Sequence, residues 1–129
     1  MSIQIQIDSG IQDAEEVRFL LATTADDLQG IPSGKMITDS ENLSFVYLLE
    51  IEEGYRQLHF TQPVWPLMLE VLKLDVDPVL AWQDKIVSLK GFKDELKMLI
   101  YNIEGNDNYG EAFSLAVEQA FYDILHDVD

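Results

Sequence analysis

The stretch Asn102-Ile-Glu-Gly-Asn-Asp-Asn-Tyr-Gly110 decides how the second half of this chain folds, because it holds the densest set of turn-forming residues in the sequence. Before it, apolar residues recur at the spacing of one helix face: Phe92, Leu96, Leu99, Ile100 and Ile103. After it, the same spacing returns at Phe113, Ala116, Val117, Ala120, Phe121 and Ile124. We therefore predict helices at about 92–103 and 109–126, packed as an antiparallel hairpin.

The oxygen atoms of this turn also suggest a calcium loop, but the residue spacing argues against one. Such a loop needs a glycine at its sixth position and a glutamate at its twelfth. Counted from Asp107, Glu118 stands at the twelfth position, but Ala112 occupies the sixth. Counted from Glu104, the twelfth residue is Leu115. Both registers fail, so we predict no metal site in the turn.

Helix capping accounts for the turn residues instead. Gly105 is the expected C-cap, because glycine readily adopts the left-handed conformation that ends a helix. Asn106, Asp107 or Asn108 would cap the next helix, since their side chains accept hydrogen bonds from free backbone N–H groups. In this interpretation the turn sets the angle between the two helices.

Strand patterns fill most of the chain before the hairpin. We predict strands at about 3–8, 17–23, 35–38, 43–51, 55–61, 79–82 and 86–89, and a short helix at 64–74. A short helix competes for 17–23. Ser9 and Gly10 are expected to end the first strand, a turn is expected around residues 12–14, and 25–34 is interpreted as a connector rich in glycine and proline. This order predicts one α+β domain over residues 1–129. It has a mostly antiparallel sheet, a short central helix and a C-terminal antiparallel helical hairpin packed on one face.

Composition excludes several classes of protein. Of the 129 residues, 47% are hydrophobic and 10% aromatic, which is typical of a chain that folds around a core. The apolar runs are too short to span a bilayer, and the N-terminal residues do not resemble a signal peptide. There is no cysteine, so disulfides and thiolate chemistry are excluded. We expect a cytoplasmic location.

The net charge of −16 points to the kind of partner. A strongly acidic surface repels nucleic acids and anionic membranes and favours a basic protein surface. The charge is uneven, because half of the basic residues lie within residues 85–103, and residues 104–129 contain no lysine or arginine. A second copy of the chain is therefore an alternative partner.

The sequence contains no recognisable catalytic arrangement. The two histidines, His59 and His126, have no ligands or nucleophile at suitable spacing, and we expect both to face solvent. The carboxylate pairs Glu52–Glu53 and Asp26–Asp27 are interpreted as solvated turn charges. We predict no catalytic residues, no cofactor and no metal, and we incline towards a protein that is not an enzyme.

Five residues form the candidate interaction surface: Trp65, Trp82, Lys90, Lys93 and Lys97. The tryptophans are most simply interpreted as core aromatics, but aromatic residues also dominate interface hot spots. The lysines lie at i, i+3 and i+7 and share one side of their helix. They either form a solvated face or meet the acidic surface of another copy.

Several stretches resemble the YjbL-like family of small uncharacterised proteins of Gram-positive bacteria. The similarity covers about residues 30–121 and includes residues 34–40, 45–47, Phe60, residues 63–65, Phe113 and residues 116–118. The most specific match is the turn, with Glu104, Gly105, Asn106, Asp107, Asn108, Tyr109 and Gly110. The resemblance implies a bacterial cytoplasmic protein, and it provides no catalytic residues.

Three functional hypotheses follow from the sequence. The leading one is a non-enzymatic protein-interaction or regulatory module that binds a basic protein or itself. The second is a small-molecule or cation-binding domain, either a binding protein or an enzyme, with a cleft between sheet and helices near Trp65, Tyr47 and His59. The weakest is a nucleic-acid mimic that inhibits a basic protein through its carboxylates.

Overall fold

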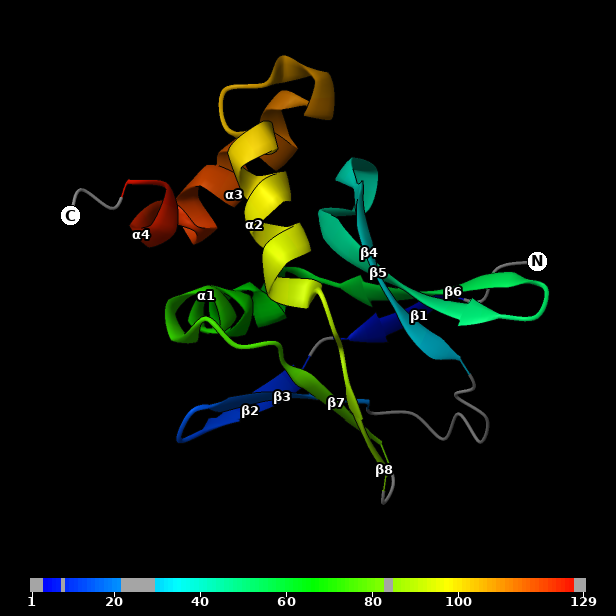
Figure 1. The fold of residues 1–129 in the computed structure, drawn as a ribbon. Coiled ribbons are helices and arrows are strands. Elements are labelled where there is room, and N and C mark those ends of the chain that lie inside the picture. Colours follow the sequence, from blue (N-terminus) through cyan, green and yellow to red (C-terminus); the bar gives the residue numbers. More distant parts are fainter. Residues whose placement is uncertain (1–3, 8, 22–29, 83–84, 127–129) are drawn as a thin grey trace.

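The computed structural model describes residues 4–7, 9–21, 30–82 and 85–126, and it confirms the α+β class (Figure 1). The strands in these residues are β1 (Gln4–Ile7), β2 (Ser9–Asp13), β3 (Glu16–Leu20), β4 (Ile31–Asp39), β5 (Ser44–Ile51), β6 (Gly54–Phe60), β7 (Val79–Trp82) and β8 (Lys85–Ser88). The α-helices are α1 (Trp65–Leu74), α2 (Phe92–Ile103), α3 (Glu111–Ala120) and α4 (Tyr122–Leu125). Short 3₁₀ turns are η1 (Ser40–Asn42), η2 (Gln62–Val64) and η3 (Asp107–Tyr109).

The strands form two four-stranded sheets instead of the single sheet that we predicted. Sheet A has the order β1-β6-β5-β4, and sheet B has the order β2-β3-β7-β8. Each contains one parallel pair, β1 with β6 and β3 with β7, and the other four pairs are antiparallel. The parallel pairs join strands that are distant in the sequence, so the local patterns of alternation did not identify them.

The sequence prediction missed strand β2 (Ser9–Asp13), because Ser9 and Gly10 were expected only to end the first strand. The chain reverses directly after β2, at residues 14–15, so the turn expected around residues 12–14 is present and slightly displaced. Gly10 explains the error. A Cβ atom there would lie 2.8 Å from Leu67 Cδ1 and 2.9 Å from the Arg18 carbonyl oxygen. Glycine at this position allows α1 and β3 to lie close to β2, and it does not mark a turn.

Strand β4 begins inside the connector predicted at residues 25–34, of which residues 25–29 lie outside the described residues. Its pairing with β5 is irregular between Pro32 and Met36, and Gly34 has a φ of +76°. Proline and glycine therefore interrupt the hydrogen-bond ladder locally without ending the strand.

The helical hairpin is present, and its second helix is interrupted. Helices α2 and α3 contact each other on either side of the turn (Figure 1). Gly105 follows the last residues of α2 with a φ of +69°, which confirms the left-handed conformation predicted for it. The helix predicted at 109–126 divides at Phe121, whose φ of −111° and ψ of 24° separate α3 from α4. The Phe121 ring is fully buried, so core packing accompanies the break.

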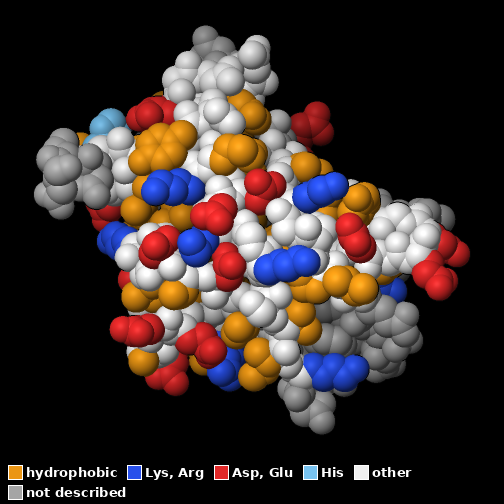
Figure 2. All heavy atoms as spheres, in the orientation of Figure 1, with side chains coloured by type: hydrophobic (Ala, Val, Ile, Leu, Met, Phe, Trp, Pro, Cys, Tyr) orange, Lys and Arg blue, Asp and Glu red, His pale blue; other side chains and the backbone are white. Residues whose placement is uncertain are grey.

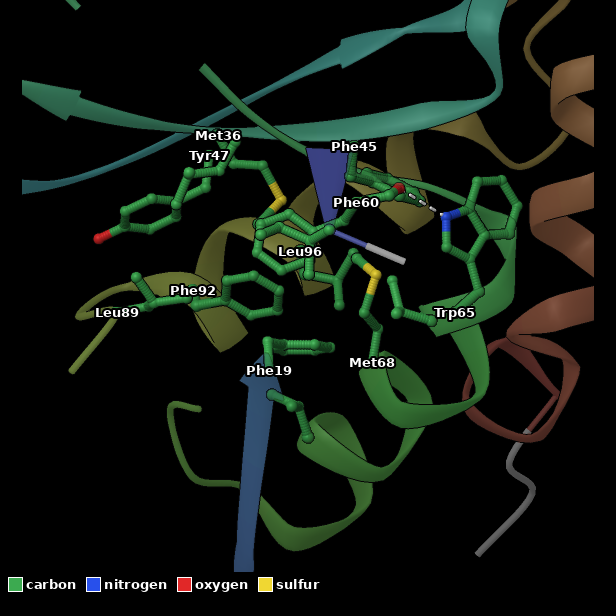
Figure 3. Packing of buried hydrophobic residues seen from close by; sticks show 14 of the residues in the cluster. Phe19, Met36, Phe45, Tyr47, Phe60, Trp65, Met68, Leu89, Phe92 and Leu96 are labelled. Carbon is green, nitrogen blue, oxygen red and sulfur yellow. Dashed lines mark hydrogen bonds between the residues drawn. The ribbon is translucent and has the colours of Figure 1, made fainter. Parts of the chain in front are cut away.

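One hydrophobic core connects both sheets with the helices (Figure 3). Phe19 of sheet B lies 4.9 Å from Phe60 of sheet A, measured between ring centroids. Trp65 extends the cluster to the hairpin, because its ring lies 5.3 Å from Phe45 and 6.0 Å from Phe121. Its indole N–H donates to the Phe60 carbonyl oxygen at 3.0 Å. Sheet and hairpin thus share one packed interior.

The start of α2 is fixed by residues from other elements. Asp77 accepts hydrogen bonds from the backbone N–H groups of Gly91 and Lys93, at 3.2 and 3.0 Å. The Tyr47 hydroxyl donates to the Lys90 carbonyl oxygen at 2.7 Å and accepts from the Gly34 N–H at 3.2 Å. These contacts satisfy backbone groups that a helix start would otherwise leave unpaired, and they hold α2 beside β4.

Candidate functional site

His59 is buried, which corrects the prediction that it faces solvent. Alternation along β6 places its side chain on the face of sheet A opposite to Leu58 and Phe60, and the residue is 5% exposed. Nε2 lies 2.9 Å from Gln57 Oε1, and Nδ1 lies 3.8 Å from Asp39 Oδ2. Burial lowers the pKa of His59 below its usual 6.5, and the Asp39 carboxylate opposes this shift.

Ser44, Asp39 and His59 have the composition of a catalytic triad, but not its geometry. Ser44 Oγ donates to the Asn42 carbonyl oxygen at 3.1 Å, and His59 Nε2 is engaged by Gln57. The 3.8 Å separation from Asp39 is too long for the hydrogen bond that orients a triad histidine. This cluster is therefore a set of structural contacts.

The lowered pKa of His59 predicts acid sensitivity. As the pH falls below 6.5, the unfolded chain takes up a proton at this residue before the folded chain does, so stability falls. In the native protein, the imidazole NMR signal of His59 should titrate with a midpoint below 6.5. This signal is assigned by its absence from the spectrum of the His59→Gln variant. The same variant should lose less stability than the native protein over this acidic range. A midpoint at or above 6.5 would contradict the burial of the ring.

The side chains of Trp65 and Tyr47, proposed to line a small-molecule cleft, are buried and hydrogen-bonded within the protein. Trp65 is 2% exposed and Tyr47 is fully buried. Burial raises the pKa of Tyr47 to about 12, although the hydrogen bond from Gly34 lowers it in part. The hydroxyl therefore stays protonated at neutral pH and cannot act as a base. The polar atoms of both side chains already have protein partners, so they do not converge on a ligand.

An open groove lies between α1, α2 and α4, with a volume of about 790 Å³. We call it the helical groove and define it by its lining residues: Leu72, Lys73, Asp75, Lys93, Asp94, Lys97, Tyr101, Tyr122, Asp123, Ile124 and His126. It holds three lysines and three aspartates, in contrast to the excess of acids in the whole chain. Figure 2 shows basic, acidic and apolar side chains intermixed on the face that carries α1 and α2.

Two lysines of the groove are held by carboxylates. Lys93 Nζ lies 3.2 Å from Asp75 and 3.5 Å from Asp94, and Lys73 Nζ lies 3.0 Å from Asp123. The hydrogen bond that Lys73 donates to Asp123 raises the pKa of Lys73, and the one that Lys93 donates to Asp75 raises the pKa of Lys93. Both amines therefore remain charged throughout the physiological range, and these ion pairs persist.

The carboxylates are more exposed than the lysines that they contact. The side chains of Asp75, Asp94 and Asp123 are 85%, 80% and 60% exposed, whereas those of Lys93 and Lys73 are 26% and 42% exposed. The groove thus presents an acidic rim above partly covered amines. Within these ion pairs, the carboxylates are therefore more accessible to an incoming molecule than the amines, and Lys97 is a further exposed lysine of the groove.

Two tyrosines supply the aromatic part of the groove. Tyr101 is 47% exposed, and its hydroxyl donates to the Ile124 carbonyl oxygen at 3.3 Å. Tyr122 is 59% exposed, and its ring stacks on His126 at 4.4 Å. His126 Nε2 in turn lies 3.6 Å from Glu104, which orders this end of the groove. Large exposed aromatic rings at fixed positions are typical of protein-binding surfaces.

The structure brings together only part of the predicted interaction surface. Lys93 and Lys97 line the groove, whereas Lys90 is exposed before α2 and is not among the lining residues. Trp65 is in the core, which corrects its assignment to a partner-binding surface. The side chain of Trp82 lies outside the described residues.

The sequence prediction missed Lys73, Tyr101 and Tyr122. Tyr101 follows Lys97 by four residues and Lys93 by eight, so the helical period places all three on one face. That spacing was a usable signal for Tyr101. Nothing in the sequence links Lys73 or Tyr122 to this face, because they come from helices whose packing is tertiary.

The turn at 104–110 has a structural role. Asn106 Oδ1 accepts from the Asn108 backbone N–H at 3.0 Å and so caps the 3₁₀ turn η3, while its Nδ2 donates to the Asn102 carbonyl oxygen at 3.2 Å. The prediction that residue 106, 107 or 108 caps the second helix is wrong, because α3 has Gly110 at its N-cap and no side-chain cap. Ser114 Oγ donates to the Asn106 carbonyl oxygen at 3.0 Å and thereby ties the turn to α3. The side chain of Asp107 lies outside the described residues.

The described part of the chain shows neither a metal-ion cluster nor a membrane-spanning helix. No three His, Asp or Glu side chains gather there in an arrangement that would hold a metal ion. None of the helices described has the length and apolar character needed to cross a membrane.

Comparisons with known proteins identify relatives over most of the chain. The model of UPF0738, a family of unknown function, matches residues 5–121. A UPF0738 protein of Lysinibacillus sphaericus is 40% identical over 119 residues, which cover 92% of this chain and 94% of that protein. The UPF0738 protein YjbL of Bacillus subtilis is 30% identical over 94% of this chain and 99% of its own length.

A third relative, from Bacillus cereus, is 33% identical over 94% of this chain and 99% of its own length. No solved structure matches the chain. The match of the family model spans nearly all of the described fold, from β1 to the end of α3. The chain belongs to the UPF0738 family.

Proposed function

We propose that this protein is a cytoplasmic, non-enzymatic protein-interaction module that binds a basic protein partner through the helical groove. The groove itself carries the proposal: it combines exposed tyrosines with an acidic rim. The net charge of −16 supports a basic partner, because it steers cationic surfaces towards the molecule.

Other functions have less support. The polar atoms of Tyr47, Trp65 and Ser44 are hydrogen-bonded within the protein, which disfavours a catalytic centre around them. A nucleic-acid mimic requires carboxylates arranged like phosphates along one surface. On the face in Figure 2, acids alternate with lysines and apolar side chains, which counts against this mimicry.

The proposal is tested by affinity capture with the immobilised full chain, at low and high salt, from a lysate of the organism that makes it. We expect a protein with a basic surface to be retained at low salt. Its retention should be weaker at high salt, because salt screens exposed charges. Light scattering of the purified chain is run alongside. A stable dimer, or no specific retention at either salt concentration, would overturn the proposed basic partner.

A further inference from the structure

We propose that the helical groove recognises arginine rather than lysine in its partner, with guanidinium groups stacked on Tyr101 and Tyr122 and paired with Asp75, Asp94 and Asp123. This inference rests on the proposed function and specifies the chemistry of the partner: an arginine-bearing segment of a basic protein. It is carried by the geometry of the rim, the two rings and the distribution of charge.

The rim carboxylates have capacity for a second cation. Asp75 and Asp94 each use Oδ1 to contact Lys93, and Asp123 uses Oδ2 to contact Lys73. In the described part of the chain, the other oxygen of each carboxylate makes no hydrogen bond or ion pair. Because these side chains are 60–85% exposed, that oxygen is accessible to an incoming donor.

The exposed rings provide the preference for arginine. A guanidinium is planar, is weakly hydrated, stacks on an aromatic face and donates two parallel hydrogen bonds to a carboxylate. A lysine ammonium is a compact, strongly hydrated charge that lacks both the stacking and the fork geometry. Tyr101 and Tyr122 line the same groove as the rim carboxylates, so a guanidinium can stack and form its paired hydrogen bonds together. His126 stacks on one face of the Tyr122 ring, so a guanidinium has only the other face available there.

Lys97 limits where a guanidinium can lie. It is exposed in the groove, and it belongs to no ion pair among the described residues. A cation near it is repelled, so we place the arginine towards the rim and the tyrosines. Removing this charge should strengthen binding of the same partner, whereas removing Lys90 outside the groove should have a smaller effect.

The test titrates the purified full chain by calorimetry with short peptides of equal length that differ only in arginine, lysine or glutamate at alternate positions. We expect the arginine peptide to bind about threefold to tenfold more tightly than the lysine peptide, from cation–π stacking at an exposed site. The glutamate peptide should not bind. Equal binding of the arginine and lysine peptides, or binding of neither, would overturn the inference.

Variants separate the groove from the general acidic field. Asp75→Asn with Asp94→Asn removes two charges from the rim, and asparagine tolerates the left-handed conformation of residue 75, whose φ is +57°. Glu52→Gln with Glu53→Gln removes two charges from the exposed β5–β6 turn and is the matched control. We expect a loss of at least fivefold for the rim pair and less than twofold for the control. Equal losses would overturn the inference.

Single variants test the rings and the lysine. Tyr122→Ala should abolish most of the arginine preference, and circular dichroism checks that the fold is intact. Lys97→Gln should bind the arginine peptide about twofold to threefold more tightly than Lys90→Gln does. If capture retains a basic partner whose binding the rim variants do not weaken, this inference and the assignment of binding to the groove fail, while the proposed interaction with a basic protein stands. If capture retains nothing, the proposed function fails as well.

Discussion

Replacing Trp65 with alanine should lower the free energy of unfolding by about 3–5 kcal/mol, the largest single-site loss that we expect in this protein. Trp65 is 2% exposed and joins sheet A to the hairpin, with Phe45, Phe113 and Phe121 all within 6.1 Å between ring centroids. Truncation leaves a cavity that these rings cannot fill without losing their own contacts. It also removes the hydrogen bond to the Phe60 carbonyl oxygen.

Urea denaturation followed by circular dichroism measures this loss without relying on tryptophan fluorescence. Trp65→Phe keeps most of the apolar volume and loses the indole donor, so we expect an intermediate effect of about 1–2 kcal/mol. Met98→Ala is the control, because Met98 is 48% exposed on α2 and should change stability by less than about 0.5 kcal/mol. A loss below about 1 kcal/mol in Trp65→Ala would contradict its placement in the core.

Gly91→Ala should be the second most damaging of these changes, at about 2–4 kcal/mol. Gly91 precedes α2 with a φ of +75°, which is costly for alanine. An added Cβ would also lie 3.1 Å from the Gly34 Cα and 3.2 Å from its carbonyl oxygen. Both neighbours are backbone atoms of β4, so relief requires α2 and β4 to move apart, against the contacts that Asp77 and Tyr47 make there.

Gly105→Ala is the matched control for the conformational part of this loss. Gly105 has a similar φ of +69°, but no atom lies within 4 Å of an added Cβ. We expect it to cost about 1 kcal/mol, from the left-handed conformation alone. The difference between the two variants, measured by urea denaturation, isolates the contact between Gly34 and Gly91. Equal losses would show that this contact contributes nothing to stability.

Local patterns predicted those elements whose signals are complete within a few residues. The β5–β6 hairpin follows from two strand-like runs around Glu52, Glu53 and Gly54. Helix α2 follows from its apolar spacing, and the left-handed Gly105 from the chemistry of helix ends. These are the places where backbone preference, side-chain pattern and tertiary packing agree.

The errors arise where residues distant in the sequence decide the outcome. Gly10 was interpreted as the end of a strand, but it lies inside β2, where Leu67 and Arg18 approach it closely. His59 was placed in solvent by its alternation with Leu58 and Phe60, but its neighbours on sheet A, with Gln57 and Asp39 at its ring nitrogens, bury it. Alternation assigns a residue to a face of the sheet, but it does not determine what covers that face.

For the helical groove too, local sequence pattern accounts for one part and tertiary packing for the other. Sequence by itself determined the acidic charge, the hairpin turn at 102–110 and the face of α2 that carries Lys93 and Lys97. Only the tertiary structure decided that the end of α1 and the short helix α4 meet this face, with the carboxylates of Asp75 and Asp123 at the rim. The reason is physical: helical periodicity is a property of neighbouring residues, whereas a groove depends on how separate helices pack on one core.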